Sequence, residues 1–252
     1  MTQPNNGQRS PKKKQFFDEN TRGDKLAFFV EALTKWFRNN GRNLPWRRTR
    51  DPYRILVSEI MLQQTNVDIV IPIYNKFLQE FPTIQTLAQS SIQEIKKITD
   101  ELGYKRRGEF LHEIAKQITY ERKGEFPSNL GELLALKGIG RYTAGAILSF
   151  AFEKPAAIVD VNVERVLTRI FGLWRWERNA KLEKEIWKIS EAMIANKENV
   201  WTINQGILDL GATICVAKKP KCPLCPMIKI CEYYELEVPK ITPLDSFFNK
   251  DT

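Results

Sequence analysis

Four cysteines lie close together near the C-terminus, and they are the only cysteines in the chain. They are Cys215, Cys222, Cys225 and Cys231, spaced as C-x6-C-x2-C-x5-C. Thiols this close in sequence can converge on one metal centre, whereas disulfides usually close longer loops. Zinc and an iron-sulfur cluster both accept four thiolates. Zinc ribbons tend to pair two C-x2-C knuckles across a longer gap and this run has one, so we favour a [4Fe-4S] cluster.

The segment between the first two cysteines is basic. It contains Lys218 and Lys219, and Lys221 directly precedes the second cysteine. A metal-bound loop of this composition would direct positive charge outward, which suits a phosphate backbone. We therefore expect Lys218 and Lys219 to contact DNA.

Two glycines stand two positions apart in the segment LKGIGRYTA, residues 136–144. Gly138 and Gly140 permit a tight turn with positive φ, and the helix that follows would offer unpaired backbone N–H groups to an anion. We expect Gly138, Gly140 and Arg141 to contact the bound anion. A DNA phosphate is the natural candidate. A bare G-x-G more often marks an ordinary turn between helices, so the pair alone is a weak signal.

Two carboxylates are candidates for acid chemistry. Glu59 lies in the apolar run ILVSEIML, residues 55–62, where burial would raise the pKa of its carboxyl toward a value useful for a general acid. A salt bridge is the alternative role for Glu59. Asp160 follows an apolar stretch and precedes an expected helix, so an N-cap is its simplest role.

One protonated and one ionised carboxylate form the minimal apparatus for cleaving a glycosidic bond through an oxocarbenium-like transition state. The same logic holds for an N-glycosidic bond in DNA. In that chemistry Glu59 would protonate the departing base, and Asp160 would stabilise the sugar cation.

The elements that must hold these residues are helices. Apolar residues recur at helical spacing, and helix-length segments are punctuated by proline or glycine. Clear β alternation is nearly absent, so we expect an all-α fold of many short helices. The expected helices cover residues 25–39, 53–64, 66–81, 92–102, 107–120, 130–136, 143–152, 163–171, 182–195 and 202–214.

Length and charge set broader limits. A chain of 252 residues with 42% apolar content can build one large or two small domains. With 39 Lys and Arg against 30 Asp and Glu, its net charge of +9 favours an anionic partner. Without a transmembrane-length apolar run or a signal peptide, we expect an intracellular protein of the cytoplasm or nucleoid, or of the nucleus in a eukaryote. We expect the polar residues 1–24 to form a disordered basic arm.

Several of these segments, taken in order, resemble the endonuclease III superfamily of DNA glycosylases, particularly its MutY-like adenine glycosylase branch. They are LPWRRTRDPYRILVSEIMLQQT, LKGIGRYTAGAILSFAF, IVDVNVERVL and the four-cysteine run. The resemblance implies a six-helix domain, residues 45–154, with a helix-hairpin-helix motif. It implies an iron-sulfur domain made of residues 25–44 and 155–235, followed by a tail at 236–252. An extruded base would enter the cleft between the two domains.

The resemblance also implies roles for individual residues. Glu59 matches the catalytic acid, Asp160 the universal aspartate, and Asn162 a site asparagine of MutY-like enzymes. Tyr142 stands where bifunctional relatives place a Schiff-base lysine, which implies a monofunctional enzyme without an efficient lyase step.

The end of the first matching segment implies a contact with the DNA bases. Gln63, Gln64 and Thr65 match the L-Q-Q-T loop that inserts near the estranged guanine or 8-oxoguanine. Glutamine amides can hydrogen-bond base edges. An ordinary polar helix end is the alternative for this loop.

Some positions depart from the MutY-like pattern. Val161 replaces the glycine of D-G-N, Lys105 replaces an aromatic wedge, and only a short tail follows the cysteines where a C-terminal domain is usual. The short MIG-type glycosylases, which remove thymine or uracil opposite guanine, have a similar length and also carry tyrosine at the Tyr142 position. MIG-type enzymes tend to have basic residues at the positions that Gln63 and Gln64 occupy in this chain.

The leading hypothesis is therefore a monofunctional base excision repair glycosylase that removes adenine mispaired with guanine or 8-oxoguanine. The first alternative is removal of thymine or uracil from G:T or G:U mismatches. The second is a non-catalytic protein that binds DNA structure. We expect a monomer with a [4Fe-4S] cluster that acts on double-stranded DNA containing a mismatch, with no membrane partner.

Overall fold

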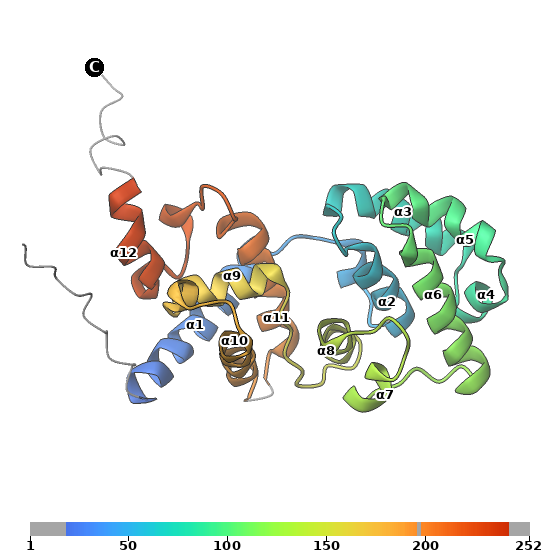
Figure 1. Ribbon diagram of the computed structural model, residues 1–252, viewed down its shortest axis with the longest axis horizontal. Coiled ribbons are helices and arrows are strands. Elements are labelled where there is room, and N and C mark those ends of the chain that lie inside the picture. Colours follow the sequence, from blue (N-terminus) through green and yellow to red (C-terminus); the bar gives the residue numbers. More distant parts are fainter. Residues whose placement is uncertain (1–18, 196–197, 242–252) are drawn as a thin grey trace, which may run out of the picture.

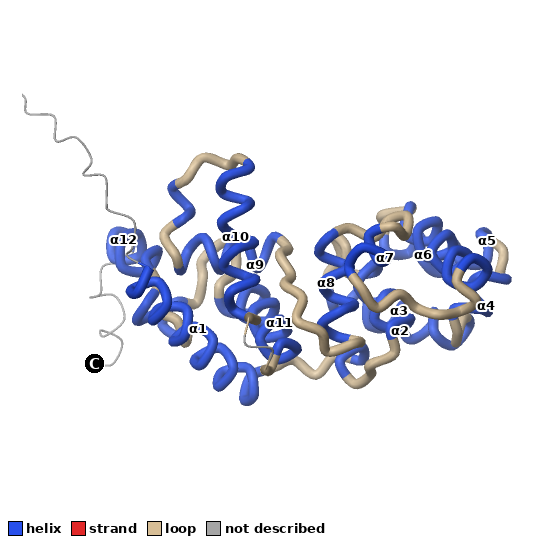
Figure 2. The backbone as a smooth tube through the Cα atoms, turned by 90° about the horizontal axis from the view of Figure 1, so that it is seen from below, coloured by secondary structure: helices blue, strands red, loops and turns tan. Residues whose placement is uncertain are grey.

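The computed structural model describes residues 19–195 and 198–241, and every regular element in this part of the chain is a helix (Figures 1 and 2). The predicted all-α fold is confirmed. No described helix has the length and apolar character needed to cross a membrane. The α-helices are α1 (Glu19–Asn40), α2 (Pro52–Met61), α3 (Val67–Glu80), α4 (Ile84–Gln89), α5 (Ile92–Thr99), α6 (Arg106–Lys116), α7 (Leu130–Leu134), α8 (Arg141–Phe150), α9 (Val161–Ile170), α10 (Ala180–Met193), α11 (Val200–Asp209) and α12 (Glu232–Ile241).

Polar residues at helix starts explain many of these boundaries. The side chain of Asn66 accepts a hydrogen bond from the Asp68 amide at the start of α3. Ser91 forms a reciprocal capping box with Glu94 at the start of α5. Such caps satisfy backbone N–H groups that have no partner inside the helix.

Helix α1 begins earlier than predicted, and helix α12 was not predicted. Residues 19–24 were expected to belong to the disordered arm, but they form the first turns of α1, where Arg22 pairs with Glu185 of α10. Residues 236–241 were expected to belong to the tail, but they form the second half of α12. The sequence pattern revealed neither feature. Both helices are held by partners distant in the chain, since Arg22 pairs with Glu185 and Lys25 pairs with Glu232 of α12. The rest of the arm and of the tail lies outside the described residues.

Two predicted helices end differently, and the short helix α4 was also missed. The segments expected at 107–120 and 202–214 finish in π-helical turns, Gln117–Glu121 and Leu210–Ile214. Helix α4 was not predicted, because six residues between Pro82 and a serine pair are too short for a periodic pattern to stand out.

The buried apolar side chains form two clusters. The first draws on residues 44–158, and in it α2 packs against α3, α6 and α8. The second joins Phe29 and Leu33 of α1 to residues 163–227, and here α1 packs along α11. Figure 1 shows α1 in the same lobe as α9 to α12, although the two segments lie at opposite ends of the sequence. We propose that these two clusters are the cores of the two predicted domains.

Candidate functional site

Glu59 is a buried acid on α2, and its side chain reaches toward α8. The residue is 5% exposed and its carboxyl hydrogen-bonds to the side chain of Tyr142. Burial raises the pKa of Glu59 to about 7, and the nearby Asp160 adds to the rise, while the Tyr142 hydrogen bond and Arg47 oppose it. A substantial fraction of Glu59 is therefore protonated near neutral pH, and the protonated form is the one required of a general acid.

Tyr142 is the second residue of α8 and keeps its proton. Burial, followed by the charges of Glu59 and Asp160, raises the pKa of its phenol well above the ordinary value. The hydroxyl therefore remains a donor to the Glu59 carboxyl. Tyr142 directly follows the glycine-rich turn, so its hydrogen bond to Glu59 links that turn to the buried carboxyl.

Asp160 caps helix α9 with both carboxylate oxygens engaged. Oδ1 accepts hydrogen bonds from the amides of Asn162, at 2.9 Å, and Val163, at 2.8 Å. Oδ2 accepts one from Asn162 Nδ2 at 2.8 Å. The N-cap role considered for Asp160 is confirmed. The same carboxylate influences the pKa of Glu59, so the cap also belongs to the site.

Arg47 is a further member of the site that sequence pattern did not reveal. Its side chain is 6% exposed, and its Nη1 and Nη2 each donate to Asp209 at 2.8 Å. Asp209 is fully buried on α11 and also accepts from the backbone N and Nε of Arg42. Burial would raise the pKa of Asp209, but the bonds from the two arginines outweigh it and lower that pKa.

The guanidinium of Arg47 places positive charge near the buried carboxyl of Glu59. Arg47 lowers the pKa of both Glu59 and Tyr142, and its Nε is buried without a hydrogen-bond partner among the described residues. Arg47 lies in the first matched motif, LPWRRT, but its partner Asp209 lies 162 residues later. Sequence offers no local pattern that pairs residues so far apart.

Asn162 connects the Asp160 cap to the first cysteine. Its Oδ1 accepts a hydrogen bond from Arg165 Nη2 at 2.8 Å, and the same guanidinium donates through Nε to the carbonyl of Cys215 at 2.8 Å. Arg165 also donates to the carbonyl of Gly211 at 2.8 Å. The position of α9 relative to the cysteine segment is thus set by directional bonds.

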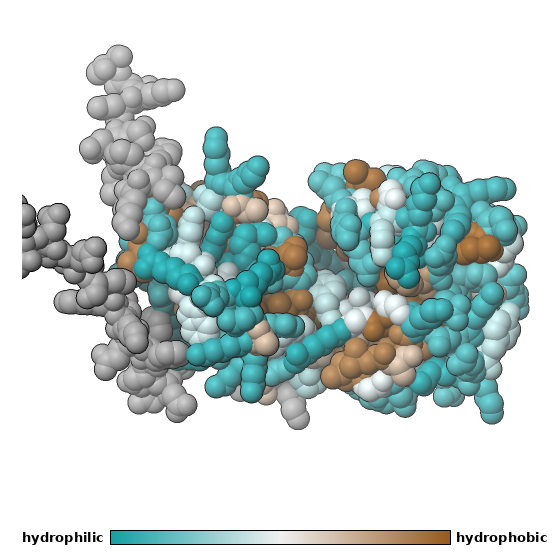
Figure 3. Space-filling model, viewed as in Figure 1, coloured by the Kyte–Doolittle hydropathy of each residue, from teal (hydrophilic) through white to brown (hydrophobic). Residues whose placement is uncertain are grey.

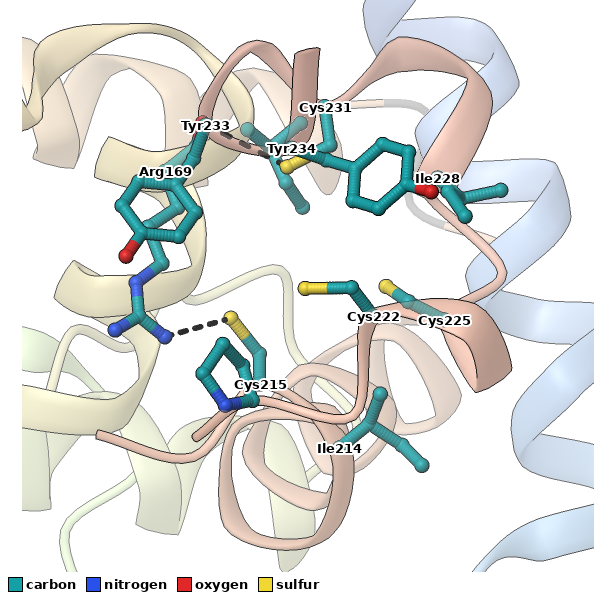
Figure 4. A pocket seen from close by; sticks show the side chains of 11 residues that line it. Arg169, Ile214, Cys215, Cys222, Cys225, Ile228, Cys231, Tyr233 and Tyr234 are labelled. Atoms are coloured by element: carbon teal, nitrogen blue, oxygen red, sulfur yellow. Dashed lines mark hydrogen bonds between the residues drawn. The ribbon is translucent and has the colours of Figure 1, made fainter. Parts of the chain in front are cut away.

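The four cysteines line one cavity beside α9 (Figure 4). Arg169 of α9 donates to Cys215 Sγ at 3.5 Å and to the carbonyl of Val216 at 2.8 Å. The figure shows the four sulfur atoms around a common space. The other lining residues include Ile170, Ile214, Pro220, Ile228, Tyr233 and Tyr234.

Four thiols are a donor set that either a zinc ion or an iron-sulfur cluster can use. In the described part of the chain no group of three or more potential ligands is close enough to hold one metal ion. Burial, with smaller contributions from the other cysteines, raises the pKa of Cys225 to about 12, so thiolates here require a positively charged partner.

The glycine-rich turn joins α7 to α8, as a helix-hairpin-helix motif requires. Gly138 has φ 91°, as expected, but Gly140 is the N-cap of α8 with an extended φ of −92°, so only the first glycine uses the left-handed region. Both are exposed, and the buried Ile139 between them anchors the turn. Leu130 and Leu134 of α7 are partly exposed, and Figure 3 shows an apolar patch over this helix.

The lysines and the arginine that were predicted to contact DNA differ in their surroundings. Lys218 and Lys219 are exposed in the cysteine segment. Arg141 is also exposed, but its guanidinium lies 3.6 Å from the ring centroid of Trp187 and pairs with Glu191 of α10 at 2.7 Å. Its side chain therefore bridges α8 and α10 instead of extending the hairpin.

The Gln63–Thr65 loop, which was predicted to contact the DNA bases, directly follows α2, the helix that carries Glu59. Gln63 and Thr65 are half-buried, whereas Gln64 is exposed and has φ 57°. A left-handed backbone is uncommon for a residue other than glycine. The loop therefore presents Gln64 to solvent in a conformation that its neighbours must maintain.

The raised pKa of Glu59 predicts a pH-dependent difference in stability. The carboxyl favours folding fully while protonated, below its ordinary pKa of 4.5, and this contribution is lost as pH rises through about 7. Relative to wild type, the Glu59→Gln variant should therefore gain about 3 kcal/mol in unfolding free energy between about pH 4 and about pH 8. Urea denaturation at both pH values measures the gain. The exposed Glu109→Gln change is the control, and an equal gain there would contradict the assignment.

Comparison with known proteins places this geometry in a family. The model of the HhH-GPD superfamily of base excision DNA repair proteins matches residues 57–192. The chain is 41% identical to the adenine DNA glycosylase of Buchnera aphidicola subsp. Schizaphis graminum, over 83% of this chain and 60% of that protein. It is 36% identical to the thymine/uracil-DNA glycosylase of Methanothermobacter thermautotrophicus, over 84% of this chain and 95% of that protein.

A solved structure of a thermostable thymine-DNA glycosylase superposes with a TM-score of 0.78 at 35% identity, covering 85% of this chain and 98% of that one. The chain spans about 60% of the length of the Buchnera adenine glycosylase. The predicted resemblance to helix-hairpin-helix DNA glycosylases is confirmed, and the chain belongs to the HhH-GPD superfamily of base excision DNA repair proteins.

Proposed function

We propose that the protein is a monofunctional DNA glycosylase that releases adenine mispaired with guanine or 8-oxoguanine. The observation that carries this proposal is the buried Glu59, which lies beside Tyr142 and Asp160 and whose pKa is raised to about 7, so that part of it is protonated near neutral pH. A purine leaves as a neutral base once a ring nitrogen is protonated, so it requires an acid of this kind. The identity to adenine DNA glycosylases supports the same base.

The site residues divide the reaction between them. Glu59 donates its proton to the departing base as the N-glycosidic bond breaks, and the electron pair of that bond leaves with the base. The Asp160 carboxylate, held by three N–H donors, stabilises the sugar cation until water adds. Tyr142 carries no amine, so it cannot form the Schiff base of a lyase step.

Removal of thymine or uracil opposite guanine is the second candidate. The thymine/uracil-DNA glycosylase relative is matched over nearly its whole length, whereas the adenine-specific relative extends well beyond the matched region. A pyrimidine leaves more readily as an anion, so this reaction depends less on Glu59. The two candidates therefore differ in their need for the acid.

Single-turnover base release distinguishes the candidates. The purified protein is incubated in excess over otherwise identical duplexes that carry A opposite 8-oxoguanine, A opposite G, T opposite G, or U opposite G. Alkali then reveals abasic sites. Fast release of adenine alone supports the proposal. Release of thymine or uracil alone would establish the second candidate, and no release from any duplex would favour the non-catalytic DNA-binding alternative.

We propose that the DNA runs along the exposed hairpin and the basic cysteine segment. Gly138 and Gly140 would bind phosphate through backbone amides, and Lys218 and Lys219 would contact the backbone without reading sequence. The protein would act as a monomer on mismatched double-stranded DNA. Arg141 would contribute indirectly, since its side chain is bonded to α10.

Cys215, Cys222, Cys225 and Cys231 would hold a [4Fe-4S] cluster in the cavity of Figure 4. When bound, the cluster would cross-link this segment and so fix the position of the exposed lysines. Protein purified without oxygen should contain about four irons per chain, with the broad visible absorbance of iron-sulfur centres.

The Cys225→Ala variant should lose most of this iron and melt at a lower temperature, because the cross-link is gone. Metal analysis and thermal unfolding measure both effects. Lys229→Ala, an exposed change in the same segment, should keep the iron. One zinc per chain in place of iron would contradict the cluster assignment.

A further inference from the structure

Arg107 is an arginine with no exposed surface. It is the second residue of α6 and the largest fully buried side chain in the described part of the chain. Taking a guanidinium out of water is costly, and burial lowers the pKa of Arg107 accordingly. An apolar side chain would fill the same space at lower cost, so the charge and the donor geometry of Arg107 require an explanation.

Arg107 donates hydrogen bonds to neutral oxygens on the last turn of α2, on the Gln63–Thr65 loop and at Leu102. Nε donates to the carbonyl of Ile60 at 3.2 Å, and Nη1 donates to the carbonyl of Leu102 at 3.0 Å. Nη2 donates to Thr65 Oγ1 at 2.6 Å and to the carbonyl of Gln63. The planar guanidinium thus holds the end of α2, the Gln63–Thr65 loop and the start of the 102–105 loop together.

The strained residue of the first loop lies between two of these anchors. Gln64 is exposed with φ 57°, and the groups that Arg107 bonds belong to the residues on either side of it. A left-handed conformation costs a residue with a side chain about 1–3 kcal/mol and persists where surrounding contacts determine it. Arg107 supplies such contacts, and Thr65 Oγ1 adds a bond to the Leu102 carbonyl at 3.2 Å.

The second loop carries the aromatic and basic residues Tyr104 and Lys105. The Arg107 guanidinium lies 5.4 Å from the ring centroid of Tyr104. Its bond to Ile60, the residue after Glu59, connects both loops to the helix that carries the buried acid. One side chain therefore fixes the relative positions of two exposed loops and of the acid's helix.

We propose that Arg107 is a positioning residue for mismatch recognition. It holds Gln64 in its strained, exposed conformation and fixes the Gln63–Thr65 loop against the 102–105 loop, so that both meet the DNA as one rigid surface. The inference rests on the proposed function, in which these loops probe the bases around the mismatch. It extends that function by assigning mismatch discrimination to a residue that does not touch DNA.

The Arg107→Lys variant tests this role in binding. Lysine keeps the charge but cannot form the forked set of bonds. Apparent affinity for the A:8-oxoguanine duplex, from the enzyme dependence of single-turnover release, should fall about 10-fold or more, a loss of about 1.4 kcal/mol. Affinity for a fully paired competitor should change less than about 2-fold, because phosphate contacts supply that binding. Equal losses on both duplexes would overturn the inference.

A matched control separates positioning from general destabilisation. Ile114→Val is a fully buried change on the same helix, away from the loops, and should leave the ratio of the two affinities unchanged. If Arg107→Lys does not fold, Thr65→Val replaces it. That variant removes one acceptor of Arg107 while keeping the shape of the side chain, and it should reduce discrimination in the same direction by about 3-fold, consistent with one neutral hydrogen bond.

A thermal double-mutant cycle tests the positioning without any base release. Glycine adopts positive φ without a steric cost, so Gln64→Gly should raise the melting temperature while Arg107 holds the strained loop. In the Arg107→Lys background the loop can relax, and the same change should give no increase. An equal increase in both backgrounds would overturn the inference. If the wild type releases no base from any duplex, the proposed function fails, and this cycle alone decides the role of Arg107.

Discussion

Replacing Glu59 by glutamine should lower the single-turnover rate of adenine release about 10²- to 10⁴-fold, the usual contribution of a general acid. Glutamine keeps the size of the side chain and can still bond Tyr142, but it has no proton to transfer. Binding of the mismatched duplex should remain, because the hairpin and the cysteine segment are untouched. Quenched single-turnover assays at saturating enzyme measure the rate, and gel-shift titration measures the binding.

The pH dependence gives this prediction a second readout. The wild-type rate should fall as pH rises through about 7, because the acid loses the proton that it must donate. The residual rate of the Glu59→Gln variant should lack this step. The exposed Glu109→Gln change should leave both rate and profile intact. Undiminished release of adenine by the Glu59→Gln variant would remove Glu59 from the mechanism.

Replacing Asp160 by asparagine should reduce base release about 10²- to 10³-fold, as expected when one electrostatic contact to a developing charge is lost in a closed site. Asparagine is as good an N-cap as aspartate, so helix α9 should keep its start and the stability should change by only about 1 kcal/mol. The bond from Asn162 Nδ2 is the one that asparagine cannot accept in the same way. Rate and thermal unfolding are measured on the same preparation.

The same chemical change at another helix provides the control. Asp51 caps α2 by accepting a hydrogen bond from the Tyr53 amide, and Asp51→Asn should leave the rate of base release unchanged. Retained activity in the Asp160→Asn variant would reduce Asp160 to a structural cap. Lost duplex binding in that variant would point to a misplaced α9 instead of a missing charge.

Sequence pattern was most informative where the signal is local. Helical periodicity identified most of the helices, because an amphipathic face repeats within a few turns. It missed α4, which is short, and α12, and it placed residues 19–24 in a disordered arm. Those residues are helical in a lobe where Arg22 contacts Glu185 and Lys25 contacts Glu232. Contacts of this range leave no periodic trace in the chain.

In the candidate site, too, the residues predicted from the sequence are those with a local signal. Glu59 and Asp160 were predicted, since an acid in an apolar run and a carboxylate before a helix are visible in a single segment. Arg47 and Arg107 were not, although both are buried among the groups that shape the site. Their partners lie far away in sequence or are backbone carbonyls, which no residue type reveals.

The sequence by itself determined the helical character of the protein, the candidate acid and cap, and the thiol set that could hold a cluster. Each of these depends on residue types within one short segment. Only the tertiary structure decided how these residues act on one another. It buried Glu59 beside Tyr142, joined Asp160 to the cysteine segment through Arg165, and placed one buried arginine between two exposed loops. The pKa of an acid and the conformation of a loop depend on distances and solvent exclusion, which arise only when distant segments pack together.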